Sequence, residues 1–188
     1  MKKFLTILSL VSFMPYANAG LILQDSNNSA YQVLHYSSIG QSFTAEDNQI
    51  QSIGFFFNTF NPQVGIASLT ITLLNGDGLG GSAIGSSTFT PAAGSNDWFD
   101  ADFSSVLLTI GNVYTAQIST GNAYWGLQAN IGADYYAGGQ AFLSSAPING
   151  DFRFRVIPAT SVPEPATLAL LGLGLAGLGF TRRSRASA

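Results

Sequence analysis

The residues of this 188-residue chain best suited to chemistry lie in one short segment, residues 97–103, which reads Asp-Trp-Phe-Asp-Ala-Asp-Phe. Successive side chains of a β-strand point to opposite faces, so Trp98, Asp100 and Asp102 share one face and the two phenylalanines share the other. If the phenylalanines face the core, an indole ring is exposed beside two carboxylates. Such a ring can stack on a sugar while carboxylates accept hydroxyl hydrogen bonds or hold calcium. The segment predicts a glycan or calcium face; the alternative is an ordinary outer face with solvated charges.

A second candidate is Asp77, in the glycine-rich segment 75–81. Its glycines match the Gly-x-Gly-x-x-Gly spacing of dinucleotide-binding loops, but no helix pattern follows to present its N-terminus to a phosphate. Asn-Gly-Asp-Gly predicts a hairpin turn instead. Asp77 alone falls well short of the roughly six to eight oxygens that calcium takes. We therefore expect no obligatory cofactor, with calcium as the one metal left open.

Groups for catalysis are scarce. The chain has no cysteine and one histidine, His35, and its two lysines are both at the N-terminus. No Gly-x-Ser-x-Gly motif occurs, so most nucleophile and base pairs are absent. A glycosidase that uses Asp100 and Asp102 is the one enzymatic alternative, although acidic β domains commonly offer such a pair. We expect a protein that is not an enzyme, with His35 as a partly buried structural residue.

The charge is sparse and acidic in the middle of the chain. Residues 20–162 contain nine acidic residues against two arginines and no lysine. Nucleic-acid binding needs a basic patch, so this class of function is excluded. Arg153 and Arg155 are expected to pair with carboxylates, since they are the only cations there to offset the self-repulsion.

The middle of the chain has the period-two pattern of half-buried strands. The clearest alternation is at residues 69–73, 114–118 and 152–156, and further strands are expected at 39–45, 50–60, 87–90, 97–103, 106–110, 124–130 and 140–143. Short strands separated by Gly, Asn and Pro turns predict an all-β, antiparallel β-sandwich or jelly roll over residues 20–157. We expect Trp125 in the core and Tyr124, Tyr135 and Tyr136 on the surface.

Residues 1–19 have the three parts of a secretory signal peptide: two lysines, an apolar run of about 11 residues and a small-residue site. The run is too short to cross a bilayer. Ala17 and Ala19 are the small residues that signal peptidase requires, so the mature chain is expected to begin at Gly20.

The other end divides into a linker at 158–165, an apolar helix at 166–181 and a basic tail at 182–188. Two prolines keep the linker extended, because each disfavours helix before it. The helix is short for a transmembrane span, so crossing requires snorkelling or local thinning. The tail's basic residues are Arg182, Arg183 and Arg185. By the positive-inside rule they stay cytoplasmic, which places the body outside the inner membrane.

The run Val-Pro-Glu-Pro-Ala-Thr at 162–167, with its glycine-rich helix and arginine cluster, resembles the PEP-CTERM protein-sorting signal of Gram-negative bacteria. The resemblance covers about the last 25 residues. It implies that an exosortase, an integral-membrane enzyme, recognises Pro163, Glu164 and Pro165 and removes the helix and tail. The body then goes to the cell surface or the extracellular matrix. A plain tail anchor is the alternative.

Three hypotheses follow for the exported body. The first is a non-catalytic module associated with extracellular polysaccharide, which the sorting signal and the Trp98 face favour. The second is a structural surface or biofilm protein without a specific ligand. The third is a hydrolase acting on glycans. The inner membrane, signal peptidase and exosortase are the partners expected during export.

Overall fold

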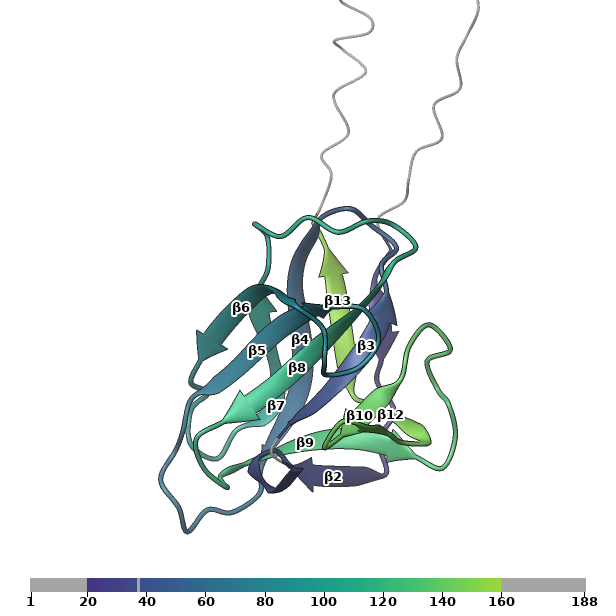
Figure 1. Ribbon diagram of the computed structural model, residues 1–188. Helices are drawn as coiled ribbons and strands as arrows, with labels where there is room; N and C mark the ends of the chain where they lie inside the picture. Colours follow the sequence, from purple (N-terminus) through teal and green to yellow (C-terminus); the bar gives the residue numbers. More distant parts are fainter. Residues whose placement is uncertain (1–19, 37, 160–188) are drawn as a thin grey trace, which may run out of the picture.

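The computed structural model describes residues 20–36 and 38–159 (Figure 1). In this part of the chain the fold is all-β, with two antiparallel sheets and one turn of 3-10 helix, η1 (Leu34–Tyr36). Alternating side chains and frequent turn residues favour strands over helices. The predicted all-β, antiparallel architecture is confirmed. The predicted signal peptide and C-terminal helix lie outside the described residues.

The first sheet, sheet A, has seven strands. They are β1 (Ile22–Gln24), β2 (Ser29–Gln32), β4 (Ile50–Thr59), β7 (Asn96–Asp102), β9 (Trp125–Ile131), β12 (Gly150–Phe152) and β13 (Phe154–Pro158). The long strand β4 pairs with β7 along one edge and with β13 and then β9 along the other. In this register Phe56 lies opposite Trp98, and Gly54 lies between Asp100 and Arg155.

The second sheet, sheet B, has six strands. They are β11 (Ala146–Pro147), β10 (Ala141–Leu143), β3 (Ile39–Thr44), β8 (Val113–Thr120), β5 (Leu69–Asn75) and β6 (Ala83–Phe89). The turn after β5 contains Gly76 and Gly78, whose φ angles of 85° and 94° favour glycine. Because β5 pairs with β6 across this turn, the glycine-rich segment is a hairpin connection, as predicted.

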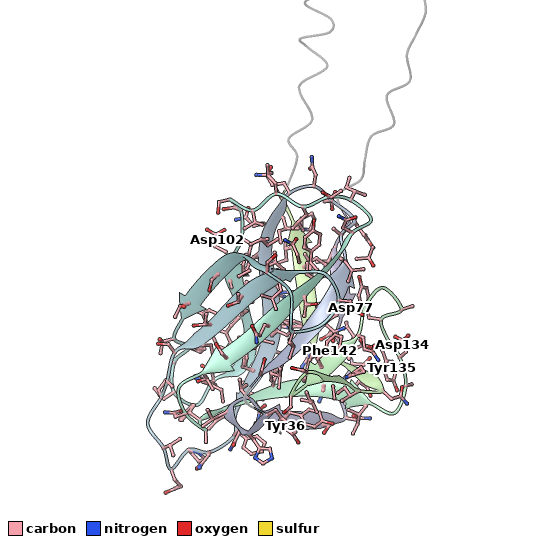
Figure 2. The ribbon with its side chains drawn as sticks, viewed as in Figure 1. Tyr36, Asp77, Asp102, Asp134, Tyr135 and Phe142 are labelled. Carbon is pink, nitrogen blue, oxygen red and sulfur yellow. The ribbon has the colours of Figure 1, made fainter. Side chains whose placement is uncertain are left out.

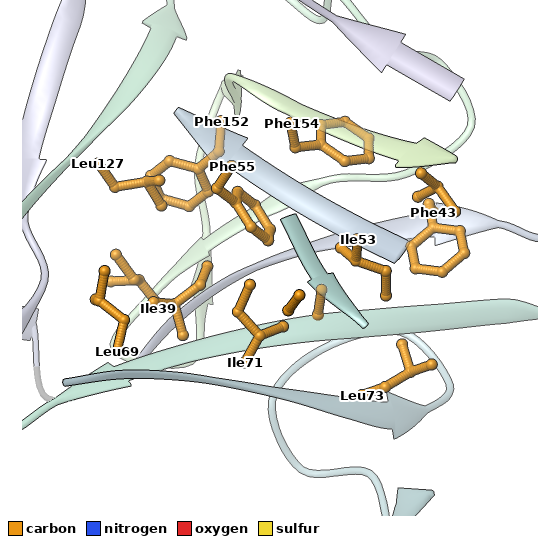
Figure 3. Close-up of a cluster of buried hydrophobic side chains, with 14 of the residues drawn as sticks. Ile39, Phe43, Ile53, Phe55, Leu69, Ile71, Leu73, Leu127, Phe152 and Phe154 are labelled. Atoms are coloured by element: carbon orange, nitrogen blue, oxygen red, sulfur yellow. The ribbon is translucent and has the colours of Figure 1, made fainter. Parts of the chain in front are cut away.

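The two sheets pack face to face around one hydrophobic core (Figure 3). The figure shows Phe55, Phe152 and Phe154 of sheet A above Ile71 and Leu73 of sheet B. All five side chains have no exposed surface. Burial of large aromatic and aliphatic side chains is the main stabilising term in a body without cysteine.

Two aromatic residues next to one another in the sequence both enter the core. Trp125 is fully buried, and its indole Nε1 donates to the carbonyl of Ala67 (2.7 Å), so the prediction for this residue is confirmed. The prediction for Tyr124 is wrong, since only 5% of it is exposed. Its ring packs on Trp125 at 4.7 Å, and its hydroxyl accepts a hydrogen bond from the Gly94 amide (2.9 Å). That polar contact lets a tyrosine be buried.

The predicted strand at 106–110 is also wrong. Residues 103–112 form the connection from β7 in sheet A to β8 in sheet B, and Leu107 makes only one isolated β-bridge, to Gln49. Of residues 106–110 only Leu108 is buried, whereas 74% of Leu107 and 56% of Ile110 are exposed. The connection must cross the end of the sandwich, where no neighbouring strand is available to continue a ladder.

The sandwich has two distinct ends. At the terminus end, loops 45–49 and 103–112 lie beside the first and last described residues: Gly20 donates to Asp47 and Ala159 donates to Gln49. At the far end are β2, η1 and loops 60–68 and 121–124. Figure 1 shows both ends of the coloured ribbon at the top, with β2 at the bottom.

Candidate functional site

The segment singled out by the sequence is β7, on the outer face of sheet A. Trp98, Asp100 and Asp102 share this face, while Ala101 and Phe103 are buried. Asp100 is not free to bind a ligand, because it forms an ion pair with Arg155 of β13. The Nε of Arg155 donates to one carboxylate oxygen (2.7 Å), and a terminal nitrogen contacts the other. This bond raises the pKa of Arg155.

Glycine at position 54 makes this ion pair possible. Arg155 and Asp100 belong to strands on opposite sides of β4, and Gly54 is the β4 residue between them. A Cβ at Gly54 would lie 2.0 Å from the Oδ1 of Asp100 and 3.2 Å from the Cγ of Arg155. The ion pair therefore lies across the bare backbone of β4.

Trp98 is half-buried, because two arginines and a phenylalanine surround its ring. The guanidinium carbon of Arg155 lies 4.5 Å from the ring centroid and that of Arg153 lies 5.3 Å from it. Phe56 contacts the ring edge-on at 5.7 Å, and Arg153 lies 3.8 Å above Phe56. These are cation–π distances. A sugar stacking on the arginine-covered side of Trp98 would first have to displace a guanidinium.

The two arginines take the carboxylate partners that the sequence predicts. Arg153 pairs with Asp25 (2.6 Å from Nε) and also donates to the side chain of Gln128 (3.0 Å). Arg155 pairs with Asp100. The outer face of β4, β7 and β13 thus joins its own positive, negative and aromatic groups to one another.

The two other predicted acids lie apart from this network. Asp102 accepts a hydrogen bond from the Ser104 amide (2.9 Å), which lowers the pKa of Asp102. Asp77 is exposed in the β5–β6 turn, well separated from Asp102 in Figure 2. Across residues 20–36 and 38–159, no three His, Cys, Asp or Glu side chains come together in a way that could hold a metal ion.

An aromatic cleft that the sequence did not indicate lies at the far end. It has a volume of about 370 Å³ and is lined by Ala30, Tyr31, Gln32, His35, Tyr36 and Phe60. Strand β2 pairs with β9 and leads, through Val33, into η1. The buried Val33, whose amide donates to Trp125 (3.0 Å), fixes this segment to the core. Figure 2 shows Tyr36 at this end.

The rings of the aromatic cleft support one another edge to face. Tyr36 lies 5.5 Å from Tyr31 and 4.8 Å from His35 by ring centroids, with interplanar angles of 76° and 83°. Such pairs hold the rings in fixed orientations. Burial, followed by the nearby Tyr36, raises the pKa of Tyr31, so its phenol is neutral at physiological pH. His35 is exposed rather than partly buried, because η1 points it away from the core.

The chemistry of this cleft suits a neutral, hydroxylated ligand. Phe60 is 45% exposed and offers an apolar ring, while Gln32 and His35 bring side chains able to donate and accept hydrogen bonds. The lining contains no carboxylate, lysine or arginine. Aromatic rings with a few polar groups are typical of small-ligand sites.

A second cavity, of about 310 Å³, is lined by Asp134, residues 139–140 and residues 147–151. Only 1% of Asp151 is exposed. One carboxylate oxygen accepts from Gln41 (2.9 Å), and the other accepts from the amides of Tyr135 (2.9 Å) and Tyr136 (3.0 Å). All three contacts hold protein elements together, so we assign Asp151 a structural role.

The remaining predicted residues belong to the two ends of the chain. Ala17, Ala19, the Pro163-Glu164-Pro165 motif and the three arginines lie outside the described residues. In the described ranges, no helix is long and apolar enough to span a bilayer. Gly20 is described, and its amide donates to Asp47 (2.9 Å).

A folded β body, followed directly by an apolar segment and terminal arginines, defines a class of exported proteins that reach their destination through the membrane. Within this class, residues 161–184 match the PEP-CTERM protein-sorting motif. The chain is therefore an exported protein that an exosortase sorts to the cell surface or the extracellular space. No curated protein and no solved structure matches the chain.

Proposed function

We propose that the body is a non-catalytic module that associates with extracellular polysaccharide and binds it in the far-end aromatic cleft. The observation that carries the proposal is the composition of the cleft: three aromatic rings, an imidazole and an amide, with no carboxylate, lysine or arginine in the lining. Such a site favours neutral sugars, whose apolar ring faces stack on aromatics and whose hydroxyls bond to polar side chains.

The position of the cleft supports this proposal. The sorting motif begins two residues after Ala159, at the terminus end of the sandwich, whereas the cleft is at the far end. A body held by its C-terminal segment would therefore present the cleft away from the membrane. This is where a matrix polymer would meet it.

The proposed route of export has three steps. Signal peptidase removes residues 1–19, the inner membrane holds the precursor, and the exosortase of a Gram-negative cell acts at Pro163-Glu164-Pro165. Successive strands β3 to β5 and β7 to β10 alternate between the sheets, which supports the jelly-roll description of the body. The proposed module uses no obligatory cofactor, with calcium as the one metal left open.

Glycan arrays that include the host's own matrix polysaccharide test the binding site. Replacing one stacked ring with Phe60→Ala should weaken binding about tenfold, as expected for a contact of about 1.4 kcal/mol. Ile66→Ala is the matched control, since Ile66 is similarly exposed (43%) in the loop beside Phe60 but is not a lining residue. Equal glycan binding by both variants would show that the cleft is not the binding site. Trp98→Ala would then test the β7 face.

A structural surface protein without a ligand is the second candidate. It is favoured by sheet B, whose six strands contain no charged residue. Hydroxyl pairs such as Thr70 with Thr88 (2.8 Å) cover the outer face of β5 and β6. Absence of binding to any glycan would favour this alternative. A hydrolase has the least support, because the Asp100 carboxylate that it would use forms an ion pair with Arg155.

A further inference from the structure

The most exposed large hydrophobic residues of the described chain gather at one end. They are Leu107 (74% exposed), Ile110 (56%) and Leu21 (55%). Leu107 and Ile110 belong to the β7–β8 connection, and Leu21 follows the first described residue. Hydrogen bonds link this connection to loop 45–49, which also contacts Gly20 and Ala159. The three side chains thus surround the terminus end, and we call them the apolar rim.

The chain outside the described residues limits how far the apolar rim can be from a bilayer. Ala159 is the last described residue, and the predicted helix begins seven residues later, at Ala166. Seven fully extended residues span at most about 25 Å, and the lipid headgroup region occupies part of that distance. Before signal-peptide removal, the apolar N-terminal run is tethered to the same end, because it lies just before Gly20.

We propose that the apolar rim contacts the lipid headgroup interface while the sorting helix is in the inner membrane. Exposed Leu and Ile side chains gain free energy when they leave water for the edge of the acyl region. Two tethers at one end force that end, and no other, to face the bilayer. The contact would hold the folded body upright and fix the short linker, with its Pro-Glu-Pro motif, close to the membrane surface where an integral-membrane enzyme can reach it.

The charges at this end decide which lipids the apolar rim accepts. Glu46 is exposed and Asp47 is half-buried in the neighbouring loop, and none of the described basic residues lies there. An anionic lipid surface would repel these carboxylates. The partner is therefore a zwitterionic lipid surface, and anionic lipid should weaken the contact.

Site-specific fluorescence on the full-length chain tests the proposal. The protein has no cysteine, so the thiol introduced by Leu107→Cys or by Ile110→Cys can carry an environment-sensitive dye without side reactions. The matched control is Ile66→Cys, at an exposed apolar position in loop 60–68 at the far end. The protein is reconstituted in vesicles of phosphatidylcholine and phosphatidylethanolamine that carry a quencher in the headgroup region.

The expected result is a blue-shifted dye at positions 107 and 110, with quenching several-fold greater than at position 66. Adding Leu107→Ser should reduce quenching of the dye at position 110, because one apolar side chain strengthens such partitioning about tenfold. Equal quenching at 66 and 107 in protein that floats with the vesicles overturns the proposal. So does quenching that appears only when exosortase is added, since the partner is then a protein. Protein that fails to float contradicts the membrane topology itself and leaves glycan binding unaffected.

Discussion

Removal of the Asp151 carboxylate should destabilise the body more than any other single change to its acidic residues. Asp151 lies in β12, and it joins this strand to Gln41 of β3 and to the loop after β9. Gln41 is fully buried and also accepts a hydrogen bond from the Phe152 amide (2.9 Å), so the network connects the two sheets. The perturbation is Asp151→Ala.

The magnitude follows from the groups left without a partner. The amides of Tyr135 and Tyr136 both donate to one oxygen of Asp151, while Gln41 Nε2 keeps a second acceptor, the carbonyl of Ser42 (3.2 Å). Two partly buried donors therefore lose their acceptor, at about 1–3 kcal/mol each where water cannot replace it. We expect a loss of about 3 kcal/mol, a large part of the roughly 5–15 kcal/mol that stabilises a domain.

Urea unfolding of the mature protein, followed by the fluorescence of the buried Trp125, measures this loss. The control is Asp134→Ala, which removes an exposed carboxylate from the loop after β9 and should change the free energy of unfolding by less than about 0.5 kcal/mol. An Asp151→Ala variant as stable as the control would refute the assignment of Asp151 as the structural link between the sheets.

The pH dependence gives a second readout of the same residue. Burial raises the pKa of Asp151, and the three hydrogen bonds it accepts only partly oppose this. The folded state then holds the proton more tightly than the unfolded state, in which the pKa of the carboxyl is about 3.9, as in a model peptide. Stability contributed by Asp151 thus increases as the pH falls through the folded pKa. The difference in the free energy of unfolding between wild type and Asp151→Asn should therefore increase on acidification. A decrease would mean that folding lowers the pKa of Asp151.

Three further predictions concern the ion pairs and the metal. Gly54→Ala should break the Arg155–Asp100 pair by steric contact and cost about 1 kcal/mol or more in urea unfolding, whereas an unchanged stability would show that the pair contributes nothing. Cleavage before Gly20 should place its new ammonium group beside Asp47, making the mature form more stable than the uncut form by up to about 1 kcal/mol, and Asp47→Asn should abolish that difference in melting temperature. A chelator should change neither the melting temperature nor glycan binding; a fall in either would reveal a calcium site.

Much of the fold could be predicted from alternation alone. Leu69, Ile71 and Leu73 are all fully buried on β5, as their period-two spacing predicts. The pairing of Arg153 and Arg155 with carboxylates was also predictable, because a body with few cations must use them to offset its acids. These features depend on local pattern or on net charge, and both are visible in a single sequence.

The features that could not be predicted from the sequence pattern depend on contacts between distant segments. The aromatic cleft combines Tyr31 and Tyr36 with Phe60, which follows β4, and no spacing in the sequence links them. The apolar run at 106–110 has strand-like composition, but its place at the end of the sandwich leaves it without a ladder partner. The sequence does contain one signal for the aromatic cleft: Tyr31 and Tyr36 are close in sequence, on either side of the buried Val33.

Intact mass and cell fractionation of the native protein, beside a Glu164→Ala variant, show whether an exosortase processes and sorts this chain. We expect the native chain to lose both ends and leave a body from Gly20 to about Pro163 in the surface or matrix fraction, while the variant stays uncut in the inner membrane. A native chain with an intact C-terminus in the inner membrane would refute sorting by an exosortase, because the motif would then serve only as a tail anchor.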